Sequence, residues 1–187
     1  MKKRTTMLAL LLATGAGTCL QAQEKLTQFK VRDAITVRTP IMNDSINPKG
    51  EKYADKDLLK TPVVLDLADA PFQVLSTDTA GVLSFPKAEK DHSIYLLETS
   101  LRAERFMTGK LKVTSPARWE IFINGESKMS KENAEDSISG ASTREVNLRL
   151  EPEADYEITI KLLSGSKDKA VPTLKCELIK DCLLYTS

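Results

Sequence analysis

The sequence is poor in the residues on which most enzyme active sites depend. It has a single histidine, His92, among 187 residues, and no Gly-x-Ser-x-Gly motif accompanies it. Any Ser-His-Asp triad would have to use His92, which we expect to be a surface or turn residue at the start of a strand. No glycine-rich phosphate loop is present, and no pair of carboxylates stands out as the acid and base of a glycosidase. We therefore expect a domain without catalytic activity and without a cofactor.

Cysteine is equally scarce. Of three cysteines, Cys19 lies in the N-terminal leader described below and Cys182 in the last six residues, which leaves Cys176 alone in the body of the chain. A single cysteine excludes an internal disulfide and a Cys-based zinc site. Because Cys176 alternates with polar residues, we expect it to be a small core residue. The aspartates between residues 55 and 69 do not have the spacing of a calcium loop, so no metal is expected.

The chain also lacks a surplus of basic residues. Residues 1–22 hold three of the 27 basic residues and no acidic one, so 24 basic residues stand against 26 acidic residues in the remainder. Proteins that bind nucleic acid neutralise phosphates with clustered Lys and Arg. This balance argues against a nucleic-acid partner.

The N-terminus has the three-part pattern of a secretory signal. Basic residues at positions 2–4 precede the apolar run Met7–Leu20, and a small residue, Ala22, stands at the expected cleavage site. The run is shorter than the roughly 20 apolar residues that span a bilayer. We expect residues 1–22 to be removed and the mature protein to be periplasmic, outer-membrane-associated or extracellular, with no membrane span.

Two further features concern the ends of the chain. Ala16-Gly17-Thr18-Cys19 resembles a lipobox, which would make Cys19 a lipidation site, although Thr18 departs from that motif. The last six residues, CLLYTS at 182–187, resemble a translated sequencing adapter; the alternative is a short apolar tail that packs as a final strand. If they are adapter-derived, we expect the natural protein to continue into another module.

Between these ends the hydrophobic pattern is that of β-structure. Short runs that are apolar or alternate with polar residues are separated by turn signals, and no amphipathic helix of ordinary length is present. Asn124-Gly125 is a strong signal for a tight hairpin turn. Residues 42–60 and 128–143 are polar and are expected to be exposed connections. Strands are expected at 29–32, 34–38, 62–67, 72–75, 82–85, 93–98, 109–114, 119–123, 145–150, 156–162 and 172–179.

Short, regularly spaced strands predict an all-β fold, namely an antiparallel β-sandwich. We divide the chain into the signal at 1–22, an N-terminal strand and exposed loop at 23–61, the sandwich domain at 62–181 and the tail at 182–187. Alternation along each strand implies one buried and one solvated face.

One part of the sequence resembles a known fold family. The segments TGKLKV at 108–113, ARWEIFINGE at 117–126, REVNLRLEP at 144–152 and YEITIK at 156–161 resemble the galactose-binding-like jelly roll. Domains of this family are commonly appended to secreted hydrolases. The resemblance covers about a third of the chain and implies the fold, while no binding residue is carried over from it.

The whole chain also resembles the N-terminal regions of exported Bacteroides-type hydrolases. In some of these, a similar segment precedes a β-propeller and a serine peptidase of the prolyl oligopeptidase family. Ser45, Thr79 and Ser137 each lie in an Asp-Ser/Thr-aliphatic pattern that resembles the O-glycosylation acceptor of those bacteria. The alternative is that these Asp-Ser and Asp-Thr pairs are ordinary turn residues.

These observations predict a non-catalytic accessory domain that packs against a downstream catalytic module of the same natural chain. The alternative is a carbohydrate-binding module, which would need exposed aromatic residues beside polar groups. Tyr53, Tyr95 and Trp119 are the candidate ligand-binding aromatics. Trp119 alternates with Ile121 and Ile123, however, and this spacing favours a place in the core.

Overall fold

A computed structural model describes residues 23–37, 46, 49–51, 53–63, 71–89 and 91–181. The predictions of a signal peptide cleaved at Ala22, of lipidation at Cys19 and of glycosylation at Ser45 lie outside these residues. So do most of the strand expected at 62–67 and the tail at 182–187.

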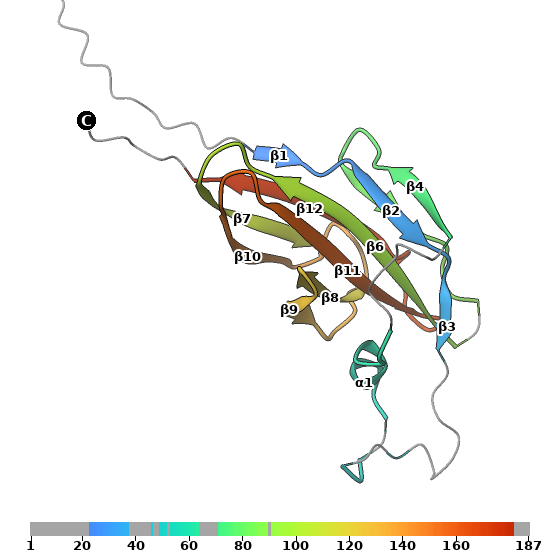
Figure 1. The fold of residues 1–187 in the computed structure, drawn as a ribbon. Helices are drawn as coiled ribbons and strands as arrows, with labels where there is room; N and C mark the ends of the chain where they lie inside the picture. The colour runs from blue at the N-terminus through green and yellow to red at the C-terminus, as the bar shows by residue number, and fades with distance from the viewer. Residues whose placement is uncertain are drawn as a thin grey trace, which may run out of the picture.

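Nearly all regular structure in the described residues is β (Figure 1). The elements are β1 (Gln23–Lys25), β2 (Gln28–Arg32), β3 (Ile35–Val37), α1 (Asp55–Leu59), β4 (Phe72–Ser76), β5 (Val82–Ser84), β6 (His92–Arg102), β7 (Met107–Thr114), β8 (Arg118–Ile123), β9 (Glu126–Lys131), β10 (Thr143–Leu150), β11 (Asp155–Gly165) and β12 (Thr173–Lys180).

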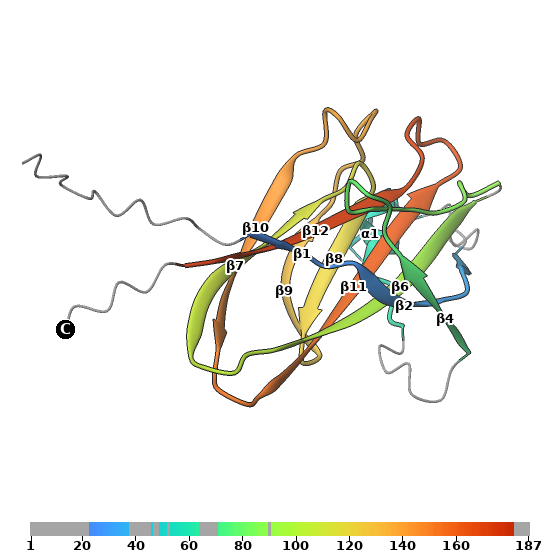
Figure 2. The same cartoon turned by 90° about the horizontal axis from the view of Figure 1, so that it is seen from above.

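The strands form two antiparallel sheets. In the first, which we call sheet A, β10, β7 and β12 are neighbours, and both β1 and β5 pair with the far edge of β12. In the second, sheet B, the order is β4-β2-β6-β11-β8-β9, and β3 also pairs with β6. The chain alternates between the sheets from β6 to β8 and again from β10 to β12, as the side and top views show (Figures 1 and 2). The predicted antiparallel β-sandwich of jelly-roll type is confirmed.

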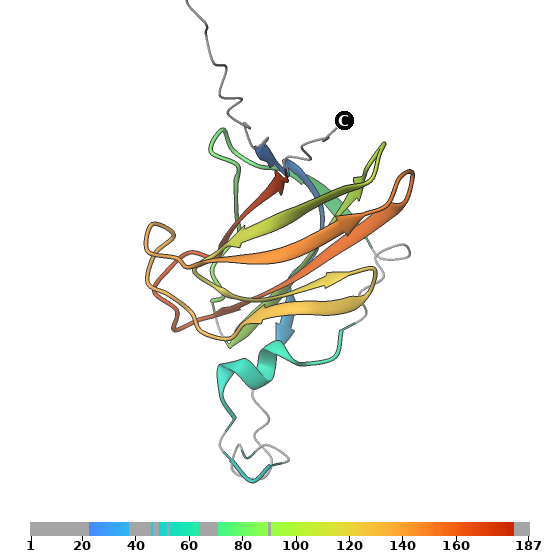
Figure 3. The same cartoon turned by 90° about the vertical axis from the view of Figure 1, so that its left-hand side faces the viewer.

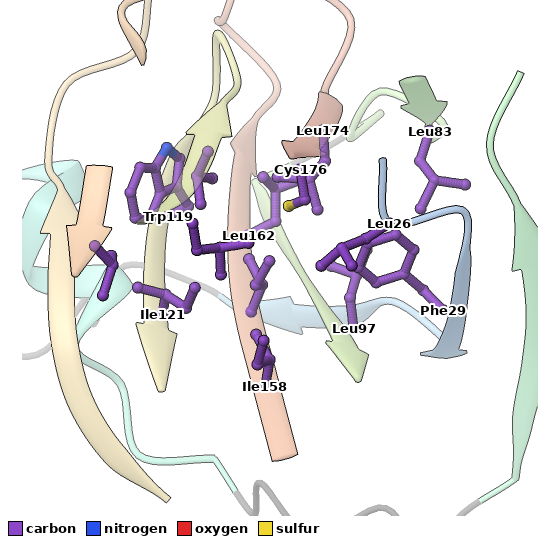
Figure 4. Packing of buried hydrophobic residues seen from close by; sticks show 14 of the residues in the cluster. Leu26, Phe29, Leu83, Leu97, Trp119, Ile121, Ile158, Leu162, Leu174 and Cys176 are labelled. Carbon is purple, nitrogen blue, oxygen red and sulfur yellow. The ribbon is translucent and has the colours of Figure 1, made fainter. Parts of the chain in front are cut away.

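The core lies between the two sheets. Alternate residues of each long strand point inward, so that β11 contributes Ile158, Ile160 and Leu162 to one buried cluster. Figure 4 shows Trp119 beside these strands at one end of the cluster and Phe29 at the other. Cys176 lies among the same residues as a buried free thiol.

A second, smaller hydrophobic cluster lies on the opposite face of sheet B. Leu58 and Leu59 of α1 pack there against Ile94, Leu96 and Leu163, which are the outward-pointing residues of β6 and β11. In Figure 3, α1 lies at the lower end of the sandwich. Among the described residues, the helix covers only one part of the outer face of sheet B.

The first and last strands of the described chain are neighbours. β1 pairs with β12, with Gln23 opposite Ile179. Both described ends of the chain therefore lie at the same corner of the sandwich (Figure 1).

Two local expectations need correction, and one strand was not expected. Residues 128–131 belong to β9 rather than to an exposed connection, because they continue the hairpin that begins at Asn124-Gly125. The loop expected at 42–60 contains α1, whose two leucines are buried against the sheet. The polar strand β1 had no alternating pattern that would indicate it.

Candidate functional site

The uncovered part of the outer face of sheet B is the best-formed candidate site. We use "outer face" for the side turned away from sheet A. Matched cross-strand positions place Lys30 of β2, Glu98 of β6 and Thr159 of β11 in one row on this face, followed by Phe122 of β8. Val74 of β4 continues the row at the sheet edge.

A large open groove begins at this row, and we call it the outer groove. It lies where β2, which follows β1 of sheet A, pairs with β6 at only two positions, Lys30 and Val31. The groove has a volume of about 1140 Å³. Its polar side chains are Glu24, Lys25, Thr27, Gln28, Lys30, Glu98, Thr99, Ser100, Asn124, Asp155 and Glu157.

An ion pair connects β2 and β6 within the groove. Lys30 Nζ lies 2.8 Å from a Glu98 carboxylate oxygen, and the Glu98 side chain is 14% exposed. The hydrogen bond and charge of Glu98 raise the pKa of Lys30, and the charge of Glu157 adds to this effect. Lys30 is therefore an ammonium group that donates from the groove wall throughout the neutral range.

The β8–β9 hairpin forms another wall of the groove. Asn124 and Gly125 both have positive φ angles, 50° and 76°, as a tight primed turn requires. The Asn124 side-chain oxygen accepts a hydrogen bond from the backbone N–H of Glu157 at 2.8 Å, and its backbone N–H donates to the Glu157 carbonyl at 2.9 Å. These two bonds hold the hairpin tip against β11, so the groove wall is fixed in place.

The lining of the outer groove carries more negative than positive charge. Four carboxylates, those of Glu24, Glu98, Asp155 and Glu157, accompany two ammonium groups, those of Lys25 and Lys30. A net charge of −2 disfavours an anionic ligand, and Glu24 and Asp155 also pair with Lys180 and Arg102 outside the lining.

A second, smaller pocket lies farther along the same face, and we call it the Phe122 pocket. It has a volume of about 360 Å³ and is lined by Lys60, Thr61, Pro62, Val63, Glu120, Phe122 and Lys161. One wall comes from the segment after α1, and the floor comes from β8 and β11.

His92 belongs to a charged cluster that fastens α1 to the sheet. Its Nε2 lies 3.1 Å from a carboxylate oxygen of Asp55, the first residue of α1. Arg118 pairs with the other Asp55 oxygen at 2.5 Å and with Asp168 at 2.9 Å. In the described part of the chain, His92 and Arg118 make their side-chain polar contacts with carboxylates, and these contacts hold α1 and the loop after β11 against β8.

The buried Cys176 thiol is also unsuited to chemistry. Burial raises the pKa of Cys176 far above its ordinary value, and the neighbouring charge of Glu177 acts in the same direction. A thiol needs a lowered pKa to act as a nucleophile at neutral pH. Among the residues that the structure describes, no three His, Cys, Asp or Glu side chains come together in a way that could hold a metal ion. No helix in the described part of the chain is long and apolar enough to cross a membrane.

The aromatic residues singled out from the sequence do not meet in one site. Trp119 is fully buried, which confirms its interpretation as a core residue. Tyr95 is 7% exposed, packs against Phe85 and donates a hydrogen bond to the Pro86 carbonyl at 2.7 Å. Neither ring faces solvent, and a ligand-binding role for either residue stays a prediction. Tyr53 is half-buried before α1, and its role stays a prediction.

Sequence analysis missed Lys30, Glu98, Glu157 and Lys161. A signal was present, because Glu98 ends the apolar run of β6 and Lys161 interrupts that of β11. Such interruptions mark the outer face of a two-sheet fold, but the pattern alone does not say which strands are neighbours. Thr79 and Ser137 are exposed in loops, as acceptors of a glycan must be, and their modification stays a prediction.

Comparisons with known proteins yield likenesses of structure only. No protein-family model and no curated protein sequence matches the chain. A β-glucosidase from Kluyveromyces marxianus in complex with glucose is similar with a TM-score of 0.46 and 13% identity, over 83% of this chain and 16% of that one. The chain thus spans about a sixth of that enzyme's length.

Two separate domains are similar over most of their own length. The PA14 sugar-binding domain from an RTX adhesin has a TM-score of 0.45 and 12% identity, over 82% of this chain and 89% of that one. A family 35 carbohydrate binding module from Clostridium thermocellum has a TM-score of 0.42 and 9% identity, over 84% of this chain and 97% of that one.

Proposed function

We propose that this chain is a non-catalytic accessory domain that binds a neutral carbohydrate in the outer groove. The observation that carries the proposal is an open groove of about 1140 Å³ whose walls present carboxylates, ammonium groups, hydroxyls and an amide. Sugars are recognised by such mixed donors and acceptors, because each hydroxyl group both donates and accepts a hydrogen bond.

The Lys30–Glu98 pair is the centre of the proposed site. A carboxylate accepts hydrogen bonds from two adjacent sugar hydroxyls, and a neighbouring ammonium donates to the oxygen of one of them. Ser100 and Glu157 lie opposite each other on β6 and β11, one step along the same face. The site therefore offers successive polar rows over which an extended glycan can run.

Affinity electrophoresis of the full chain through gels that contain neutral polysaccharides tests the proposal. We expect retardation by at least one neutral polymer. Glu98→Gln, which removes the charge and keeps the shape, should weaken retardation about tenfold or more, because charged hydrogen bonds are worth about 1.5–3 kcal/mol. Lys110→Met is the matched control, since Lys110 pairs with Glu145 on sheet A. No retardation in any polysaccharide, or equal losses in both variants, would refute the proposal.

We further propose that the domain belongs to a larger exported hydrolase. The support is the resemblance of the sequence to N-terminal regions of such proteins, among which serine peptidases are one case. Sequencing the genomic reading frame beyond the codon of Asp181 tests this. A catalytic module downstream is the expected result, and a stop codon close to that position would contradict it.

A further inference from the structure

The Phe122 pocket contains a buried ammonium group that forms an ion pair with none of the described carboxylates. Lys161 is 3% exposed, and its Nζ donates a hydrogen bond to the backbone carbonyl of Thr61. Within the described part of the chain, Lys161 forms no ion pair. An ammonium group carries three N–H donors, and the described residues supply an acceptor for one of them, the Thr61 carbonyl.

Glu120 lies opposite Lys161 on β8 and lines the same pocket, but no ion pair joins the two side chains in the described part of the chain. Its carboxylate accepts a hydrogen bond from the Ser127 hydroxyl at 2.7 Å. Burial lowers the pKa of Lys161, and the charge of Glu120 on the neighbouring strand opposes that effect. A buried charge without a close partner is costly, and an anion placed beside it relieves that cost.

The charges and the walls of the pocket define the ligand that it suits. Lys60 and Lys161 bring two positive charges against the single negative charge of Glu120, so the lining carries a net charge of +1, and Lys60 also pairs at 3.4 Å with Glu132 outside the lining. This contrasts with the net charge of −2 in the outer groove. Phe122, Pro62 and Val63 supply an apolar surface against which a ring can lie. The volume of about 360 Å³ falls at the lower end of the range of small-molecule sites.

We propose that the Phe122 pocket binds a small carboxylic acid, with its ring on Phe122 and its carboxylate accepting hydrogen bonds from Lys161. Two kinds of compound, aromatic acids and sugar acids, carry a carboxylate on a six-membered ring and could therefore occupy this pocket. This site is separate from the outer groove and does not depend on carbohydrate binding there.

Ligand titrations of the full chain, followed by amide chemical shifts, test the proposal. The probes are benzoate for the aromatic source and glucuronate for the sugar source, and benzamide and glucose are their neutral counterparts. We expect at least one acid to shift the amides of Val63, Phe122 and Lys161 in a saturable way, with the neutral counterpart binding about tenfold more weakly or worse. Saturable shifts by benzoate alone or by glucuronate alone identify the source. No saturable shift by either acid, or equal binding of the neutral compounds, refutes the proposal.

Variants locate the binding in this pocket. Lys161→Met keeps the length of the side chain and removes the charge, and it should weaken binding of the acid at least tenfold. Lys167→Met is the matched control, because Lys167 is exposed in the loop after β11, and it should bind as the parent does. Unchanged binding in Lys161→Met would overturn the proposal. If that variant does not fold, the position of the shifted amides in the parent protein decides the question.

The same variants separate this proposal from carbohydrate binding in the outer groove. Glu98→Gln should leave acid binding unchanged, and Lys161→Met should leave polysaccharide retardation unchanged. Loss of both functions in Glu98→Gln would instead mean that the two sites are one.

Discussion

Arg118 and Asp168 form a nearly buried ion pair in which one guanidinium nitrogen, Nη1, lies 2.9 and 3.0 Å from the two carboxylate oxygens. The two side chains are 11% and 12% exposed. Asp168 also accepts a hydrogen bond from the backbone N–H of Gly165 at 2.7 Å, and the other guanidinium arm of Arg118 reaches Asp55. One arginine therefore ties the end of β11 and the start of α1 to β8.

Removing this arginine should cost considerable stability. We expect Arg118→Met to lower the free energy of unfolding by about 2–3 kcal/mol, because it leaves the buried carboxylate of Asp168 without its cation. The value lies below that of a fully buried pair because the third member, Asp55, is 43% exposed. Urea denaturation provides the measurement.

Lys169→Met is the control for this prediction. Lys169 also pairs with an aspartate, Asp136, but both side chains are about three-quarters exposed. We expect no measurable change in the denaturation midpoint. A similar loss in both variants would show that burial does not decide the strength of these pairs.

Gly109 lies against the backbone of the neighbouring strand, where no side chain fits. A Cβ atom at this position would lie 2.4 Å from the carbonyl oxygen of Ile179. Because that oxygen belongs to the backbone of β12, relief would require the strands to move apart. Gly109→Ala should therefore cost about 2–3 kcal/mol.

Thermal unfolding of Gly109→Ala beside Gly140→Ala checks this reasoning. The nearest atom to an added Cβ at Gly140 is the Ser137 hydroxyl at 3.4 Å, an ordinary contact. This control should unfold within a few degrees of the parent. A parent-like melting temperature for Gly109→Ala would contradict the close approach of β7 and β12.

Trp119 is the only tryptophan and reports on the core directly. We expect blue-shifted fluorescence that iodide does not quench in the native state. Trp119→Ala should cost about 3–5 kcal/mol. Trp119→Phe should cost much less, because the indole N–H has no hydrogen-bond acceptor in the described structure and its removal eliminates a buried unpaired donor. Red-shifted, readily quenched native emission would place Trp119 at the surface and refute this packing.

Sequence reasoning succeeded for strands that have one buried face and one exposed face. Residues 145–150 and 156–162 alternate regularly, and both lie within strands whose inward residues meet in the core. The Asn124-Gly125 turn was equally readable, because both residues have the positive φ that this pair tolerates.

Sequence reasoning failed where the position of a strand depends on the strand it pairs with rather than on its own hydrophobic pattern. β9 is an edge strand rich in serine and lysine, and its position follows from the hairpin with β8 rather than from its own hydrophobicity. The outer groove depends on the divergence of β2 from β6, which is a tertiary relationship between residues 68 positions apart in the chain. No local pattern encodes such a separation, so the groove could be recognised only from the fold.

The buried thiol of Cys176 should make stability depend on alkaline pH. Burial raises the pKa of this group in the folded state, so the folded protein keeps its thiol proton while the unfolded chain loses it above its ordinary pKa of 9.0. A raised folded pKa gives stability that is complete below pH 9 and is lost as the pH rises above it. The loss approaches about 1.4 kcal/mol per pH unit for one proton.

We expect the difference in unfolding free energy between the parent and Cys176→Ala to shrink by about 1 kcal/mol between pH 8 and pH 10, with Cys19 and Cys182 replaced by serine in both. Taking this difference cancels the opposing contributions of Lys131 and Lys161, whose pKa values burial lowers in both proteins. A difference that stays constant over this range would mean that the thiol ionises inside the folded domain, and hence that solvent reaches the space between the two sheets.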